Sequence, residues 1–266
     1  MSTLDLRFSE AELEQRREHI TAFIRDQVDA AGVDGVVLGL SGGIDSTITA
    51  YLCVDALGAE NVHGLVLPAT VSSDENMSDA ERVARDLEIG YDVIEVEPVV
   101  NALLSAYPEA EGDREAVGNA RARVRGVLNY LVANHESRLV VGTGNRSEAA
   151  VGYFTKYGDG AVDCHPIGNL YKAQVRQLAR HIGVPDDLAD KTPTAELWDD
   201  QTDEDEMGMT YETLDSILAS HVDGPLSTAA TARELGVDEE TVETVRRMYE
   251  RSEHKRRVPP GPDPLN

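Results

Sequence analysis

The chain has 266 residues, of which 49 are Asp or Glu and 24 are Lys or Arg, so its formal charge is −25. A field this negative repels nucleic-acid backbones and anionic lipid, which excludes a protein that binds either surface. The hydrophobic residues make up 41% and fall in periodic runs, which excludes a disordered chain. Acidic residues are spread over the chain and only four residues are Lys, which favours a cytosolic enzyme from a high-salt cell over an acidic face for a basic partner.

The first half of the chain alternates between helical and β-type patterns. Ser9 and Glu12 have capping-box spacing, which predicts a helix over 10–31 that ends at Gly32. The other predicted helices are 46–57, 75–87 and 114–135, and the predicted strands are 36–40, 62–67, 91–96 and 139–142. Continuously apolar strands that alternate with amphipathic helices are typical of a parallel sheet covered on both faces.

The second half is mostly helical. It begins with a Gly- and Asp-rich loop over 154–166 and includes an acidic, weakly periodic segment over 192–208. The predicted helices are 171–182, 211–219, 228–235 and 239–251, and the proline-containing tail 258–266 should be irregular. We therefore predict a doubly wound α/β fold with a parallel sheet, in a single domain over 1–266 with a helical C-terminal part.

Targeting and redox signals are weak. The N-terminus lacks the basic and apolar regions of a signal peptide, and no apolar run approaches the ~18 residues of a spanning helix, so we expect a cytoplasmic protein with no membrane contact. Cys53 and Cys164 match no ligand spacing, and Cys53 is expected in the core. Residues 228–238 and the helix after them look like a DNA-binding helix-turn-helix, but a recognition helix that opens with Asp238, Glu239 and Glu240 would be repelled by DNA.

The glycine-rich loop after the first predicted strand is the most informative segment. It comprises Gly39, Leu40, Ser41, Gly42, Gly43, Ile44, Asp45 and Ser46. Between a strand and a helix, such a loop gathers backbone N–H groups at a helix N-terminus and forms an anion site. A Walker P-loop would need Lys where Asp45 stands. The alternatives are a hydrolase nucleophile elbow with Ser41 as nucleophile, a turn without a ligand, and the S-G-G-x-D-S loop of enzymes that cleave ATP between the α and β phosphates.

A second cluster follows the fourth predicted strand. Thr143 ends this strand and Glu148 follows five residues later, so both should face the glycine-rich loop at the carboxyl edge of the sheet. Asp45 and Glu148 could then share one Mg²⁺, because carboxylate and phosphate oxygens suit that ion. Taken alone, Glu148 is as well explained as a carboxylate at a helix N-terminus.

Over nearly its whole length, the chain resembles the ammonia-dependent NAD synthetases of the N-type ATP pyrophosphatase superfamily. The matching segments are 40–46, 119–123, 142–148, 153–160, 193–198, 201–206 and 254–257. The resemblance implies a fifth strand, a cytoplasmic homodimer and a C–N ligase in which ATP adenylates the nicotinate carboxylate of deamido-NAD, releasing pyrophosphate. Ammonia then displaces AMP to give NAD. Another adenylating amide-forming synthetase with the same loop, and the Ser41 hydrolase, are the alternatives.

The same resemblance assigns roles to individual residues. It implies that 39–46, Thr143, Lys172 and Thr194 contact ATP, and that Asp45 and Glu148 hold Mg²⁺. It implies deamido-NAD contacts from Arg123, Lys156, Asp163, His254 and Lys255. Asp45, Lys156, Asp163 and Lys172 are the expected catalytic residues, and the acidic run 201–206 is expected to belong to the fold. We expect no glutaminase domain, because one would need a few hundred further residues with their own Cys nucleophile.

Overall fold

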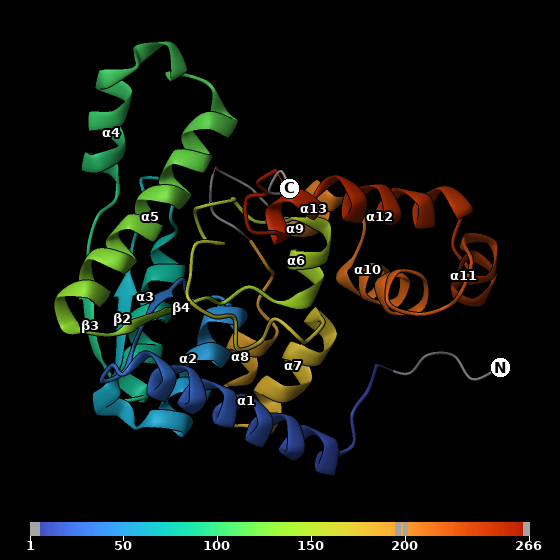
Figure 1. The fold of residues 1–266 in the computed structure, drawn as a ribbon, viewed down its shortest axis with the longest axis horizontal. Helices are drawn as coiled ribbons and strands as arrows, with labels where there is room; N and C mark the ends of the chain where they lie inside the picture. Colours follow the sequence, from blue (N-terminus) through green and yellow to red (C-terminus); the bar gives the residue numbers. More distant parts are fainter. Residues whose placement is uncertain (1–5, 195–197, 199–201, 263–266) are drawn as a thin grey trace.

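The computed structural model describes residues 6–194, 198 and 202–262 (Figure 1). Its centre is a parallel four-stranded sheet in the order β3-β2-β1-β4. The strands are β1 (Val36–Leu40), β2 (Val62–Val66), β3 (Gly90–Val93) and β4 (Leu139–Val141), which confirms the four predicted strands. Where the resemblance implies a fifth strand, the described residues form one isolated parallel bridge between Val141 and Cys164.

Successive residues of β1 enter different cores, as expected for a strand buried on both faces. Val36 and Leu38 belong to one hydrophobic cluster and Val37 to another. Five helices contribute to the first cluster: α1 (Glu10–Ala31), α2 (Ile44–Leu57), α3 (Asp74–Asp86), α7 (Lys172–His181) and α8 (Asp186–Ala189). The second cluster lies under α4 (Glu97–Ala106) and α5 (Arg114–Glu136). The short turns η1 (Ala59–Asn61) and η2 (Pro108–Ala110) connect these elements.

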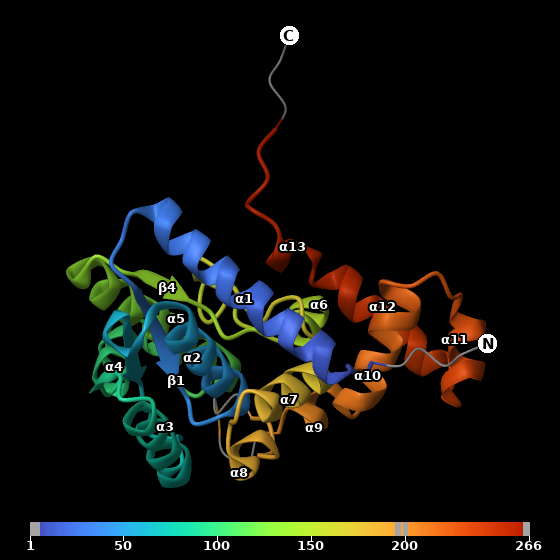
Figure 2. The ribbon, with the colours of Figure 1, turned by 90° about the horizontal axis from the view of Figure 1, so that it is seen from below.

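A third cluster forms the helical C-terminal part, which stands beside the sheet layers in Figure 1. Its elements are α6 (Arg146–Val151), α9 (Asp203–Met207), α10 (Tyr211–Ile217), η3 (Leu218–Val222), α11 (Thr228–Leu235), α12 (Glu239–Arg251) and α13 (Glu253–Arg256). Val242 and Val245 of α12 are fully buried in this cluster. The pair α11–α12 therefore uses its apolar face for packing within the chain. Residues 258–262 run away from the body (Figure 2).

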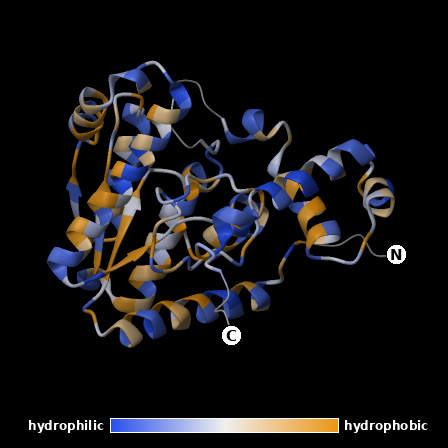
Figure 3. Cartoon of the chain, turned by 45° about the horizontal axis from the view of Figure 1, so that its top comes forward, coloured by the Kyte–Doolittle hydropathy of each residue, from blue (hydrophilic) through white to orange (hydrophobic). Residues whose placement is uncertain are grey.

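Several helix boundaries predicted from the sequence agree with the structure. The bounds of α1, α11 and α12 are those predicted, and Gly32 ends α1 in the left-handed conformation. The sequence analysis missed α4, α6, α8, α9 and α13. The strands are coloured mostly as hydrophobic in Figure 3, whereas the helices carry broad hydrophilic stretches. Cys53 is buried in the core as predicted, and within the described ranges no helix is long and apolar enough to cross a membrane.

Candidate active site

The glycine-rich loop joins the end of β1 to the start of α2. Gly43 occupies the N-cap position of α2 and supplies no side-chain cap, so the first N–H groups of the helix keep their donor capacity for a ligand. The Ser46 hydroxyl donates to the Gly43 carbonyl oxygen (3.1 Å) and accepts from the Ser41 N–H (3.2 Å), which fixes the curvature of the loop. This is the strand–loop–helix setting that an anion-binding loop requires.

Gly42 is the loop position that requires glycine. Its φ is +73°, in the region that favours glycine, and a Cβ built there would lie 2.3 Å from the backbone oxygen of Asn76 in α3. The loop therefore packs directly against the N-terminal turn of α3. The shape of the loop depends on the positive φ of Gly42 and on its lack of a side chain.

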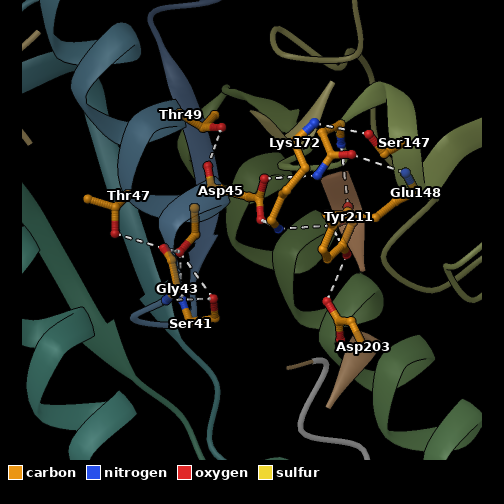
Figure 4. A network of polar contacts seen from close by, with 12 residues as sticks. Ser41, Gly43, Asp45, Thr47, Thr49, Ser147, Glu148, Lys172, Asp203 and Tyr211 are labelled. Carbon is orange, nitrogen blue, oxygen red and sulfur yellow. Dashed lines mark hydrogen bonds and ion pairs between the residues drawn. The ribbon is translucent and has the colours of Figure 1, made fainter. Parts of the chain in front are cut away.

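Lys172 joins the two predicted metal ligands. Its ammonium contacts Asp45 Oδ2 and lies 3.2 Å from Glu148 Oε1 (Figure 4). Asn145 adds a second link, because its Nδ2 donates to Asp45 Oδ1 at 3.0 Å. The structure thus brings Asp45 and Glu148, which are far apart in sequence, to one cationic centre at the carboxyl edge of the sheet. This is the proximity that the sequence analysis expected of them.

Glu148 has a local role as well. Asn145 is the N-cap of α6, its Oδ1 accepts from the Glu148 N–H at 3.0 Å, and the Glu148 side chain reaches back to complete a capping box. The alternative explanation of Glu148 as a carboxylate at a helix start is therefore confirmed together with its place beside Asp45. The capping box orients the carboxylate, and its Oε1 faces Lys172.

The buried charged groups shift one another's pKa values. Burial raises the pKa of Glu148, and Asp45 and Asp203 raise it further while Lys172 opposes them, which leaves a pKa of about 7. Burial alone would lower the pKa of Lys172, but Asp45 and Glu148 outweigh that effect and raise it. Lys172 is 1% exposed and stays charged at neutral pH. The site therefore holds a permanent cation in contact with the carboxylates of Asp45 and Glu148.

These residues line a cavity of about 740 Å³, within the size range of small-molecule sites. Most of the predicted ATP ligands border it: Gly39, Leu40, Ser41, Gly43, Ile44, Asp45, Ser46, Thr143, Lys172 and Thr194. Gly42 is buried behind the loop against α3. The Ser41 hydroxyl contacts Ser46 Oγ (3.1 Å) and the Gly43 N–H (3.3 Å), and the contacts of the described residues bring it no imidazole. A serine nucleophile would lack its base here.

Comparison with known proteins agrees with this geometry. The family model described as NAD synthase matches residues 17–259. The chain belongs to the NAD synthase family. It is 63% identical over 262 residues to the NH₃-dependent NAD⁺ synthetase of Halobacterium salinarum, and the match covers 98% of each chain.

Two solved structures resemble this NAD synthase family member closely. An NMN synthetase from Francisella tularensis superimposes with a TM-score of 0.83 at 35% identity, covering 97% of this chain and 100% of that one. The NH₃-dependent NAD synthetase from Campylobacter jejuni gives a TM-score of 0.78 at 29% identity, covering 94% and 99%. The fold is therefore that of NAD synthases along nearly the whole chain.

The residues expected to contact the second NAD synthase substrate lie further out. Lys255 borders the cavity, and its ammonium donates to the carbonyl oxygens of Gly152 and Phe154, both at 2.7 Å. Lys156 donates to the His254 carbonyl oxygen at 2.7 Å, which ties these two residues together. Arg123 and Asp163 are exposed and do not border the cavity.

Asp163 is held firmly where it stands. Its Oδ1 accepts from the Tyr130 hydroxyl at 3.0 Å and its Oδ2 from the Val140 N–H at 2.8 Å. These bonds fix the carboxylate at the side of β4, between α5 and the bridge at Cys164. Asp163 is therefore a hydrogen-bond acceptor of fixed orientation on the protein surface.

Part of the motif over 153–160 is structural. The Thr155 hydroxyl donates to Asn119 Oδ1 at 2.8 Å, and Asp159 Oδ1 accepts from the Thr155 N–H at 2.8 Å. A Cβ at Gly126 of α5 would lie 3.0 Å from the Gly158 oxygen. The turn packs tightly on α5, so several residues of this family motif shape the wall of the cavity.

The sequence analysis missed three residues of the network. Tyr211 contacts Glu148, Asp203 contacts Tyr211, and Asp215 accepts from the Ser147 hydroxyl and from the Ala173 N–H. Asp203 falls within the run 201–206 that was assigned to the fold; of this run, Gln201 lies outside the described residues. Asp203 does open a helix, but it also borders the cavity.

Proposed function

We propose that this chain carries out ammonia-dependent NAD synthesis through an adenylated intermediate formed at the glycine-rich loop. The observation that carries the proposal is the meeting of Asp45, Glu148 and Lys172 beside the uncapped start of α2. A helix start and a buried ammonium both stabilise the negative charge that develops on phosphate oxygens. Transfer at phosphorus requires mainly such positioning and charge neutralisation, and no covalent nucleophile from the protein.

In the first step, a nicotinate carboxylate oxygen of deamido-NAD attacks the α-phosphorus of ATP. The bond between the α-phosphorus and the bridging oxygen breaks, and pyrophosphate leaves with that electron pair. The loop 39–46 and Lys172 are placed to hold the pyrophosphate, and Thr143 and Thr194 border the same cavity. Lys172 keeps its proton throughout, so it acts as an electrostatic stabiliser.

In the second step, ammonia attacks the carbonyl carbon of the adenylate, and AMP leaves with the carboxylate oxygen. The amide nitrogen then loses its extra proton. We propose that Arg123, Lys156, Asp163, His254 and Lys255 bind deamido-NAD, as the family resemblance implies; Lys255 borders the cavity, and Lys156 contacts the neighbouring His254. The fixed carboxylate of Asp163 would orient a polar group of that substrate.

Asp45 and Glu148 are the residues that would hold Mg²⁺. They fit the ion because both present carboxylate oxygens at the wall of the ATP cavity, where Lys172 contacts one oxygen of each. The described residues contain no group of three or more His, Cys, Asp or Glu side chains around one position, so phosphate oxygens and water would complete the shell. When bound, the ion would neutralise charge on the polyphosphate.

We also propose that the chain acts as a homodimer that pairs through α5. Arg123, Val127 and Leu131 recur every four residues on one face of this helix, and Val127 and Leu131 are 66% and 63% exposed. An apolar stripe beside a predicted substrate ligand is typical of an interface that completes a site. Sedimentation of a Leu131→Asp variant tests this proposal: it should yield a monomer with a raised KM for deamido-NAD.

A second candidate is amidation of the mononucleotide, since the Francisella relative is an NMN synthetase. The same loop chemistry serves both reactions, and they differ only in the size of the acid substrate. A competition assay with both acids and measurement of kcat/KM for each separates the candidates.

The basic test supplies ATP, Mg²⁺, ammonium and deamido-NAD to the purified protein and follows the products at low and high salt. The proposal requires NAD, AMP and pyrophosphate in equal amounts. ADP and phosphate as products would contradict the mechanism, and turnover of the mononucleotide alone would contradict the substrate.

A further inference from the structure

Within the part of the chain that the structure describes, Tyr211 brings its hydroxyl to Glu148, one of the two predicted metal ligands. Its hydroxyl lies 3.2 Å from Glu148 Oε1 and 2.9 Å from Asp203 Oδ2 (Figure 4). Tyr211 is 1% exposed and Asp203 is 4% exposed, so water cannot replace either contact easily. The Tyr211 hydroxyl carries one proton, which the two carboxylates share.

Two residues of α9 hold Tyr211 in place. The Tyr211 N–H donates to Glu204 Oε1 at 2.9 Å, while the neighbouring Asp203 takes the hydroxyl. Asp203 is an N-terminal residue of α9, and its second oxygen, Oδ1, is buried without a hydrogen-bond partner. A buried carboxylate in this state is costly, and its contact with Tyr211 offsets part of that cost.

One turn further along α10, Asp215 contacts the residue before Glu148. Its Oδ1 accepts from the Ser147 hydroxyl and its Oδ2 from the Ala173 N–H at 2.9 Å. Residues four apart share a helix face, so α10 contacts Ser147 and Glu148 of α6 through the same side. The ring of Tyr211 also lies 4.9 Å from the Lys172 ammonium, so Tyr211 contacts Lys172 as well as Glu148.

We infer that Tyr211, held by Asp203, is a positioning residue for Glu148, and that it makes cation binding at Asp45 and Glu148 depend on the helical C-terminal part. The inference rests on the proposed function, because it takes Glu148 as a metal ligand. Together with the capping box at Asn145, the hydroxyl restricts the rotation of the Glu148 side chain and keeps Oε1 facing Lys172. Partners of this kind that orient a ligand typically change metal affinity by about 10- to 100-fold.

The test uses Mn²⁺ as the probe, with α,β-methylene-ATP, which resists cleavage between the α and β phosphates. Free Mn²⁺ is followed by electron paramagnetic resonance in the parent chain and in Tyr211→Phe, which keeps the ring but loses the hydroxyl. We expect the apparent Kd for Mn²⁺ to rise by about tenfold. Steady-state kinetics should show a matching rise in the Mg²⁺ concentration for half-maximal rate, with a smaller change in kcat.

Matched variants separate positioning from general damage. Tyr171→Phe removes a buried hydroxyl that contacts Asp223 instead, and it should leave Mn²⁺ binding unchanged. Asp203→Asn should weaken Mn²⁺ binding in the same direction, and the double variant should be no weaker than the more affected single one, because the two residues act in series. Asp203→Asn also supplies the result if Tyr211→Phe does not fold.

The outcomes distinguish the inference from the function on which it rests. If Glu148→Gln leaves Mn²⁺ binding intact, the metal assignment in the proposed function is wrong. If Glu148→Gln weakens binding but Tyr211→Phe and Asp203→Asn bind Mn²⁺ within twofold of the parent, the inference is overturned. An equal loss in Tyr171→Phe would also overturn it.

Discussion

At the residue scale, charge is concentrated where phosphate must be met. Lys172 lies between Asp45 and Glu148 at the helix start, and each of these side chains comes from a different element. None of the three acts alone, because the ammonium neutralises the carboxylates and the carboxylates keep the ammonium charged. Removal of one partner would leave buried charge uncompensated, so substitutions here should lower stability as well as catalysis.

Asp45→Asn should lower kcat/KM by at least about 100-fold, because the site loses the charge that holds a cation against the polyphosphate. The matched control is Asp55→Asn, which removes an acid from the other end of α2, where it pairs with Arg17. Unfolding curves of both variants show how much of any loss of turnover comes from a loss of stability. Near-parental turnover of Asp45→Asn would exclude a role for this carboxylate in catalysis.

Asp215 should give the folded state a measurable pH dependence. Burial raises its pKa from 3.8 to about 6, so the native state binds this proton more tightly than the unfolded chain. Its contribution to stability is therefore full below about pH 4 and is lost as the pH rises through 6, by up to about 3 kcal/mol. Urea unfolding at fixed salt should show this loss in the parent and a smaller one in Asp215→Asn; identical slopes would contradict the assignment.

Site residues could be predicted from the sequence only where a local motif marks them. Asp45 and Glu148 stand in motifs with their own turn and cap chemistry, so their roles could be proposed from the sequence. Tyr211 follows Glu148 by 63 positions and begins an ordinary amphipathic helix, so no local signal marks it. Asp203 lies in an acidic run whose other members suggest a solvated loop. Only tertiary packing brings these two residues to the site.

At the element scale, caps explain which boundaries could be predicted. Ser9 and Gly32 delimit α1, and Ser227 and Gly236 delimit α11, each with the expected cap geometry. The helix α6 has six residues, too few to show a helical period, and its start is defined by the Asn145 cap. In α4, Val100 is the single buried hydrophobic residue, so the apolar pattern of this helix does not follow one core face.

The loop before α2 should be the element most sensitive to substitution. Gly42→Ala combines a positive φ, which costs roughly 1 kcal/mol for a non-glycine residue, with a Cβ 2.3 Å from the Asn76 oxygen. The loop must move away from α3, and the KM for ATP should rise by about tenfold or more. Gly32→Ala is the control: it has the same sign of φ with no atom within 4 Å. If both variants have parental KM values, the loop does not set ATP affinity.

At the scale of the whole molecule, the charge of −25 describes the outer surface more than the site. Three of the four lysines, Lys172, Lys191 and Lys255, border the cavity, and with two arginines they nearly balance the six acidic residues of its lining, so the cavity is less negative than the surface. The exclusion of nucleic acid from the charge therefore does not extend to small polyanions. The local charge at a helix start, and not the net charge, decides whether ATP can bind.

The acidic surface should make folding and activity dependent on salt. Repulsion among carboxylates is screened within about 3 Å at 1 M salt, so molar KCl or NaCl should raise both the unfolding temperature and turnover. A protein with an acidic face for a basic partner would not need this screening. Full stability and activity in dilute buffer would remove the high-salt explanation and favour the partner.

In the proposed mechanism, the substrate carboxylate attacks the α-phosphorus of ATP at the loop 39–46. Transfer of isotope tests it most directly: deamido-NAD labelled with ¹⁸O in both nicotinate carboxylate oxygens is converted with ATP and ammonium, and the products are analysed by mass spectrometry. We expect one label in AMP and one in the amide of NAD, with unlabelled pyrophosphate. Label in inorganic phosphate, or unlabelled AMP, would contradict it.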